Sequence, residues 1–83
     1  MNLLEKIRLI ERVHGLITRE GTGSPAMLAN RLNISERNIY NLINVMKEMG
    51  APIYFCKSRN SYCYEEEVRF SFGFKVNDGV IYV

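Results

Sequence analysis

Hydrogen-bonding and basic side chains recur between residues 35 and 47, at a spacing that places most of them on one face of a helix. Arginine pairs with guanine or phosphate, asparagine pairs with adenine, and tyrosine can stack or reach a phosphate. These are the contacts that read base edges in the major groove of DNA. The candidate residues are Ser35, Arg37, Asn38, Tyr40, Asn41, Asn44 and Lys47.

Two further basic residues, Lys57 and Arg59, stand beside the turn formers Ser58 and Asn60. Turn formers between two strand-like runs favour a β-hairpin, so we expect both side chains near its tip. A basic hairpin tip is suited to contact the phosphate backbone that flanks a groove.

Other chemistry has little support in the sequence. His14 is the single histidine and has no evident acid, base or nucleophile partner, so we expect a surface or boundary residue and no enzyme. Residues 21–23, Gly-Thr-Gly, lack the Lys-Ser/Thr ending of a phosphate loop and are interpreted as a turn. Cys56 and Cys63 lack the C-x-x-C spacing of a zinc module. We therefore expect no metal and no cofactor.

Two helices joined by a tight turn should position the candidate residues. Ser24 before Pro25 is a cap followed by a first-position proline, and Ser35 is a second cap. They predict helices over residues 24–32 and 35–49. Asn33 tolerates the left-handed conformation that ends the first of these, and Gly50 ends the second.

Apolar residues repeat at helical spacing and predict the core. A first helix is expected over residues 2–19, with Asn2 and Glu5 as a capping box. Its stripe is Leu3, Ile7, Ile10, Val13 and Ile17. The stripe of the helix over 35–49 is Ile39, Leu42, Ile43, Met46 and Met49.

Alternating residues over 53–57 and 61–65 predict the two strands of the hairpin. A two-residue turn at 59–60 would place Phe55 opposite Tyr64, Lys57 opposite Tyr62 and Cys56 opposite Cys63. The face with Ile53, Phe55 and Tyr64 would cover the core. The facing cysteines leave two alternatives, a disulfide or redox switch and a pair of free thiols.

The C-terminal residues show the strongest strand pattern in the chain. After the acidic run 65–67, residues 68–76 alternate with Phe70, Phe72 and Phe74 on one face. Residues 77–79, Asn-Asp-Gly, predict a turn into a short return strand over 80–83. Three phenylalanines on one strand must be covered, either by the same chain or by a second copy, and we favour a homodimer.

Composition bounds the possibilities. With 83 residues, 47% of them hydrophobic, the chain suits one small domain with little room for a catalytic cleft. The formal net charge is only +2, so attraction to nucleic acid must come from a local patch. Charged residues interrupt the N-terminal apolar run, so we expect no membrane segment and a cytoplasmic location.

The segment over residues 28–53, LANRLNISERNIYNLINVMKEMGAPI, resembles the type-11 helix-turn-helix family of the biotin-operon repressor and related prokaryotic transcription regulators. The likeness extends over residues 7–64, and the ending SYCYEEE resembles small stand-alone members. Asn38 stands where the family usually has threonine, and Tyr40 and Asn41 where it often has basic residues. The residues that carry the likeness are Leu28, Ala29, Leu32, Ile34, Ser35, Arg37, Ile39, Ile43, Asn44, Met49, Gly50, Pro52 and Ile53.

The order of the expected elements, which the resemblance supports, predicts an α+β winged helix-turn-helix with three helices and a β-hairpin wing, and the alternating tail adds an extra C-terminal strand or hairpin. Residues 1–65 would form the DNA-binding domain and residues 66–83 a β extension for dimerisation. Double-stranded DNA would be read by helix 35–49 and contacted on its backbone by wing 57–61. No small-molecule effector domain is expected. The alternatives are a winged-helix module for protein interaction or oligomerisation without DNA binding, and an RNA-binding protein.

Overall fold

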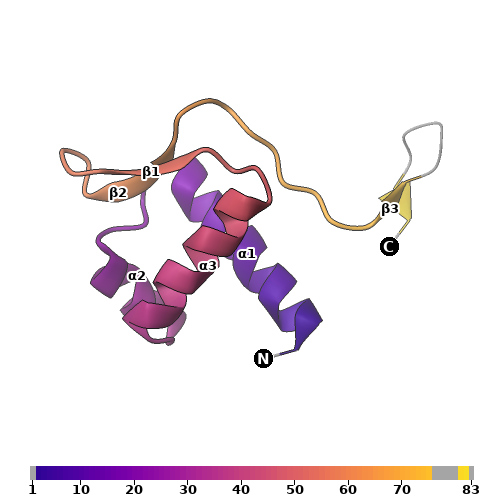
Figure 1. Cartoon of the computed structure of the whole chain (residues 1–83), viewed down its shortest axis with the longest axis horizontal. Helices are drawn as coiled ribbons and strands as arrows, with labels where there is room; N and C mark the ends of the chain where they lie inside the picture. Colours follow the sequence, from indigo (N-terminus) through magenta and orange to yellow (C-terminus); the bar gives the residue numbers. More distant parts are fainter. Residues whose placement is uncertain (1, 76–80, 83) are drawn as a thin grey trace.

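The structure is a computed structural model that describes residues 2–75 and 81–82. Three helices are followed by two antiparallel hairpins, which makes the chain a small α+β protein. Figure 1 shows the helices packed with the first hairpin, while the second hairpin lies at the end of an extended tail. The elements are α1 (Leu3–Thr18), α2 (Pro25–Leu32), α3 (Glu36–Glu48), β1 (Ile53–Cys56), β2 (Ser61–Tyr64), β3 (Phe74–Lys75) and β4 (Ile81–Tyr82).

Side-chain caps begin all three helices, which confirms the sequence prediction. Asn2, Ser24 and Ser35 each accept a hydrogen bond from the backbone N–H three residues later, at 2.8, 3.2 and 3.1 Å. Asn33 ends α2 in the left-handed conformation, with φ 57° and ψ 43°. The chain therefore turns at once from α2 into α3. Within the described residues, no helix combines the length and apolar character needed to cross a bilayer.

One hydrophobic core lies between the three helices and the first hairpin. Val13, Leu28 and Ile39, one from each helix, have no exposed surface. Two predicted core positions are wrong, since Leu3 is 71% exposed and Met49 is 57% exposed, both at helix ends. The buried cluster consists of Ile10, Val13, Leu16, Ile17, Leu28, Ala29, Leu32, Ile39, Ile43, Met46, Ile53 and Tyr62.

The first hairpin forms where the sequence predicts it but with a different register. Phe55 pairs with Tyr62, not with Tyr64, and four residues, 57–60, make the loop. The favoured two-residue turn requires positive φ at both central positions. Of the expected turn residues, Arg59 and Asn60, only Asn60 has a positive φ, at 51°. The expected pairing of Lys57 with Tyr62 is also wrong, because Lys57 lies in the loop.

The register error amounts to two residues, so each side chain keeps its predicted face. Phe55 and Tyr64 pack against the core, as expected for that face. Cys56 pairs with Ser61, and Cys63 does not face it. The predicted opposition of the two cysteines is wrong, and both are free thiols.

The link between α1 and α2 docks on β2 through one buried threonine. Thr22 is 3% exposed, and Ser61 beside it is fully buried. The N–H of Thr22 donates to Oγ of Ser61 at 3.1 Å, and the N–H of Tyr62 donates to Oγ1 of Thr22 at 2.9 Å. The threonine hydroxyl thus accepts the hydrogen bond that the N–H of Tyr62 would otherwise donate to a neighbouring strand.

The long strand predicted over residues 68–76 is wrong. The structure has only the two-residue β3, which pairs with β4. An alternating sequence forms a strand only where a second strand accepts its backbone hydrogen bonds, and no described segment does so beside residues 67–73. Phe70 packs on the core, whereas Phe72 and Phe74 are 61% and 87% exposed. The predicted turn at 77–79 lies outside the described residues.

Candidate nucleic-acid interface

The exposed face of α3 exists because its opposite face is fixed in the core. Ile39, Ile43 and Met46 are buried against the other elements, so the residues between them project outward. All seven candidates from this region are exposed: Ser35, Arg37, Asn38, Tyr40, Asn41, Asn44 and Lys47. Packing against α2 and the hairpin therefore presents this face as a preformed surface.

Ser35 and Tyr40 are already engaged by neighbouring groups. Oγ of Ser35 accepts from the N–H of Asn38 and caps α3, which leaves its own O–H free to donate. The hydroxyl of Tyr40 donates to Oε1 of Glu36 at 3.2 Å. Partial desolvation and the Glu36 carboxylate raise the pKa of Tyr40, so its phenol remains a donor at neutral pH. A phosphate would have to displace Glu36 to bind it.

Asn38 and Asn41 lie on the α1 side of this face. Both line a groove of about 270 Å³ between α1 and α3, together with Lys6, Leu9 and Val45. Because the groove is lined partly by apolar side chains, the two asparagines border an apolar depression and do not lie on a flat polar surface. The seven predicted residues thus form a face with one apolar edge, which the sequence pattern did not indicate.

The two hairpin candidates have different surroundings. Lys57 is exposed in the loop that joins β1 and β2. Arg59 forms an ion pair with Glu20, with 3.3 Å between Nη1 and Oε2, and this carboxylate raises the pKa of Arg59. The pair is exposed on both sides, so a phosphate can compete with the carboxylate. Lys57 is therefore the more available of the two.

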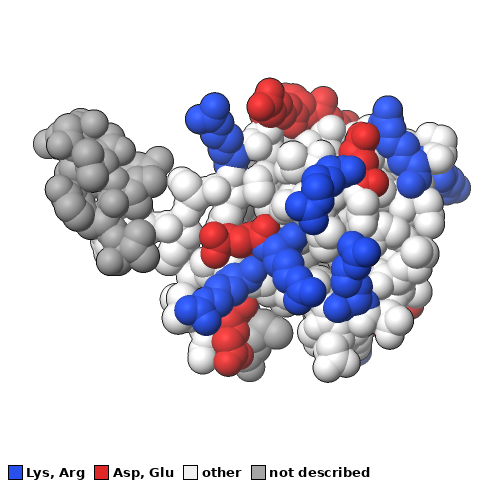
Figure 2. Space-filling view, turned by 180° about the vertical axis from the view of Figure 1, so that it is seen from behind, with Lys and Arg blue, Asp and Glu red and all other residues white. Residues whose placement is uncertain are grey.

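Charge is distributed unevenly between the helices. On α3, Arg37 and Lys47 are balanced by two glutamates, so the helix is neutral. By contrast, α1 and its C-cap hold four basic residues against Glu5 and Glu11. The four are Lys6, Arg8, Arg12 and Arg19. Figure 2 shows a band of Lys and Arg side chains over α1, with Asp and Glu side chains among them, on the face turned away from the viewer in Figure 1.

This band was not among the residues predicted from the sequence. The available signal was the four-residue spacing of Arg8 and Arg12, which puts two arginines one turn apart on the polar side of α1. The capped turn and the helical pattern of residues 35–49 directed the prediction to the α3 face and not to α1.

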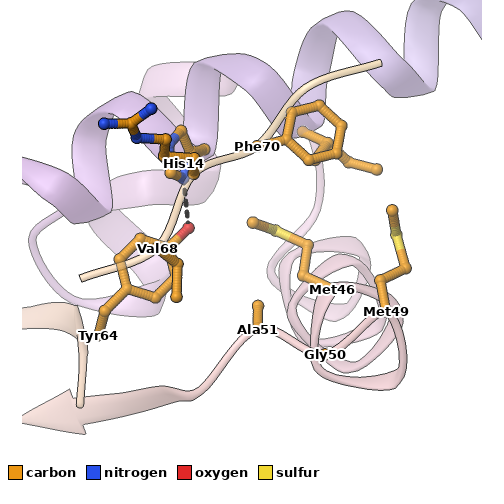
Figure 3. Close-up of a pocket in the computed structure, with 10 residues that line it drawn as sticks. His14, Met46, Met49, Gly50, Ala51, Tyr64, Val68 and Phe70 are labelled. Carbon is orange, nitrogen blue, oxygen red and sulfur yellow. Dashed lines mark hydrogen bonds between the residues drawn. The ribbon is translucent and has the colours of Figure 1, made fainter. Parts of the chain in front are cut away.

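A second feature that the sequence did not indicate is a hollow of about 190 Å³ under the tail. Figure 3 shows His14 and Tyr64 on one side of it and Met46 on the other. Nδ1 of His14 lies 2.7 Å from the hydroxyl of Tyr64, within hydrogen-bond distance, and the tautomer of the ring sets which of the two groups donates. Burial raises the pKa of this phenol, so the hydroxyl keeps its proton at neutral pH. Phe70 lies 6.3 Å from His14, ring centre to ring centre. His14 is thus a half-buried boundary residue that joins α1 to β2 and the tail.

Within residues 2–75 and 81–82, no group of three or more His, Cys, Asp or Glu side chains is placed to hold a metal ion. In comparisons with protein-family models, with curated proteins and with solved structures, no match to this chain was found.

Proposed function

We propose that the chain is a winged helix-turn-helix protein that binds double-stranded DNA in the manner of a prokaryotic transcription regulator. In this proposal α3 enters the major groove and the loop over 57–60 contacts the flanking backbone. The observation that carries it is the exposed face of α3, where arginine, asparagine and tyrosine side chains project from a helix held rigidly by its buried side. The capped turn from α2 into α3 at Asn33 supports it.

The tail supports association of two copies. Phe72 and Phe74 remain exposed although they belong to a run of alternating phenylalanines. Aromatic side chains left in solvent are commonly covered by a partner surface. A two-fold dimer would present its two α3 helices about 34 Å apart, one duplex turn, and would prefer a palindromic site.

A binding titration with two single variants tests the proposal. Arg37→Ala and Lys57→Ala should each weaken binding to a fluorescent duplex, because each removes a positive charge from the proposed surface. If the deleted side chain binds one phosphate, the slope of log K against log salt should become shallower by about 0.9. Fluorescence anisotropy over a salt series measures both effects.

Arg69→Ala is the matched control, since it removes one positive charge from the tail. It should leave the salt slope unchanged. Unchanged affinity in both the Arg37 and the Lys57 variants would reject the α3 face and the loop as the DNA-binding surface.

The neutral charge of α3 favours one alternative, a winged-helix module that binds protein through the tail and does not bind DNA. A pool of random duplexes at low and moderate salt separates the two proposals. Salt-sensitive binding supports DNA recognition. If no duplex binds even at low salt, the module is the better account, and a pull-down with the tail intact and deleted should then depend on Phe72 and Phe74.

A further inference from the structure

Three arginines form a stripe along the outer side of α1. Arg8, Arg12 and Arg19 are all exposed, and their spacing places them on the side opposite Ile10 and Ile17. At 1.5 Å per residue, the stripe extends about 16 Å along the helix axis.

The side chains make the stripe continuous. Arg8 and Arg12 line the same shallow hollow over Leu32. A guanidinium nitrogen of Arg19 lies 3.8 Å from the position that a Cβ would take at Gly15, so this side chain runs back toward Arg12.

The stripe is also free to bind. In the part of the chain that the structure describes, the one ion pair joins Arg59 to Glu20, so no arginine of the stripe forms a direct ion pair, although Glu5 borders the same hollow as Arg8 and Arg12. A row of unpaired guanidiniums repels itself, and a polyanion relieves that repulsion.

The stripe and the exposed face of α3 point in different directions, although they adjoin at one edge, where Leu9 and Ile34 line both the groove beside Asn38 and the hollow beside Arg8. Both helices bury their apolar sides in the same core, so their polar sides face away from it. The molecule extends only 19 Å along its shortest axis, which is the viewing direction of Figures 1 and 2. DNA is stiff over about 150 base pairs, so a short duplex seated along the middle of the α3 face does not bend around the molecule to lie along the whole stripe.

We propose that Arg8, Arg12 and Arg19 form a second phosphate-binding surface, so that one molecule holds two duplex segments, one on α3 and one on α1. The α3 half of this inference rests on the proposed function. The α1 half rests on the stripe alone.

The chemistry of the stripe suits a row of oxyanions, and a nucleic-acid strand supplies such a row as phosphates. Each guanidinium can donate two parallel hydrogen bonds to a phosphate, a geometry that lysine lacks. One DNA strand presents a charge about every 3.4 Å along its axis, so a row of about 16 Å can face several phosphates. An acidic protein would need a comparable row of carboxylates.

Two triple variants with the same loss of charge test the inference. The first is Arg8→Gln/Arg12→Gln/Arg19→Gln on α1. The second is Arg37→Gln/Lys47→Gln/Lys57→Gln on α3 and the loop. Both are made with and without Phe72→Asp, so that association through the tail does not supply the second binding site. Circular dichroism and thermal melts establish that each variant is folded.

The assay measures bridging. Beads carry one duplex that binds tightly, a fluorescent duplex of the same sequence is added in solution, and capture is measured at about 0.1 M salt. Anisotropy with one duplex measures simple binding. At this salt, charges more than about 10 Å away are largely screened, so loss of the stripe should hardly alter binding on α3.

The wild-type chain should capture the second duplex. The α1 variant should capture at least about ten-fold less while its single-duplex affinity stays within about two-fold, because three phosphate-binding side chains are removed from one surface only. The inference is overturned by equal capture with the α1 variant. It is also overturned if the wild type binds one duplex and captures no second, which would leave an acidic protein as the partner of the stripe.

The α3 variant distinguishes this inference from the proposed function. Unchanged single-duplex affinity in this variant, with complete loss of binding in the α1 variant, would reject α3 as the DNA-binding helix and keep the phosphate surface on α1. Loss of binding in the α3 variant, with unchanged capture by the α1 variant, would support α3 as the DNA-binding helix and reject the phosphate surface on α1.

Discussion

Single buried side chains determine how the α1–α2 link attaches to the hairpin. Oγ1 of Thr22 accepts from the N–H of Tyr62 and donates to the carbonyl of Gly23 at 2.8 Å. Thr22→Val keeps the shape and removes both bonds, so a buried N–H loses its partner. We expect the free energy of unfolding to fall by about 1–3 kcal/mol in urea denaturation. Thr18→Val, on the exposed side of α1, is the control and should change it by less than about 0.5 kcal/mol.

The two thiols should differ in reactivity. A hydrogen bond with Ser58, 3.2 Å from the sulfur, and backbone N–H groups hold the pKa of Cys56 below its ordinary value. Desolvation raises the pKa of Cys63, which is 1% exposed. Because the thiolate is the reactive form, Cys56 should be alkylated first at neutral pH.

Peptide mass spectrometry of iodoacetamide-treated protein over a pH series measures this difference. The rate at Cys56 should rise at lower pH than for a free thiol, and Ser58→Ala should shift that rise to higher pH. Equal rates at both cysteines would contradict the assignment.

At the scale of elements, the turn from α2 into α3 depends on one left-handed residue. Asn33→Ala should cost about 1–2 kcal/mol of unfolding free energy, because a Cβ disfavours this conformation unless a short polar side chain compensates. Asn33→Gly should leave the unfolding free energy nearly unchanged, because glycine adopts the left-handed conformation without steric cost. Asn30→Ala, within α2 and exposed, should stabilise by a few tenths of a kcal/mol through helix propensity. Thermal or urea unfolding ranks the three, and equal effects at 30 and 33 would refute the role of the turn.

The elements also show how far the sequence could predict this fold. The helix starts were predictable because a capping side chain bonds within its own turn, as at Ser24 and Ser35. The hairpin register was not, because it depends on which loop residue takes positive φ, and only Asn60 does. The docking of Thr22 was not predictable either, since its partners lie about forty residues away.

In the candidate site too, features that depend on local sequence were predictable and features that depend on distant contacts were not. Helical periodicity sufficed to predict that the seven candidate residues are exposed, although it wrongly placed Met49 in the core. It could not reveal that Arg59 pairs with Glu20, or that Arg19 lies back over Gly15, because both depend on neighbours in space. The alternating residues of the tail predicted a strand, but no described segment pairs with residues 67–73.

At the scale of the whole molecule, the tail divides into an anchored part and an exposed part. Phe70 packs on the core while Phe72 and Phe74 do not. Phe72→Asp should therefore give monomers in sedimentation experiments without loss of stability, because a charge in the apolar contact opposes association. Tyr54→Asp, at an exposed aromatic of β1, should leave the mass unchanged. A dimer that survives Phe72→Asp would place the interface elsewhere, with the first helix as the next candidate.

The hydrogen bonds of Thr22 with Ser61 and Tyr62 join chain positions 39 and 40 residues apart, and they enclose α2, α3 and β1 within one closed loop of chain. The α2–α3 pair needs only local contacts and is free to form early in folding, whereas closing this loop needs distant segments to meet. We expect the closure to come after the folding transition state. Weakening it should then accelerate unfolding far more than it slows folding, so this link governs how long α3 stays in place once the chain has folded.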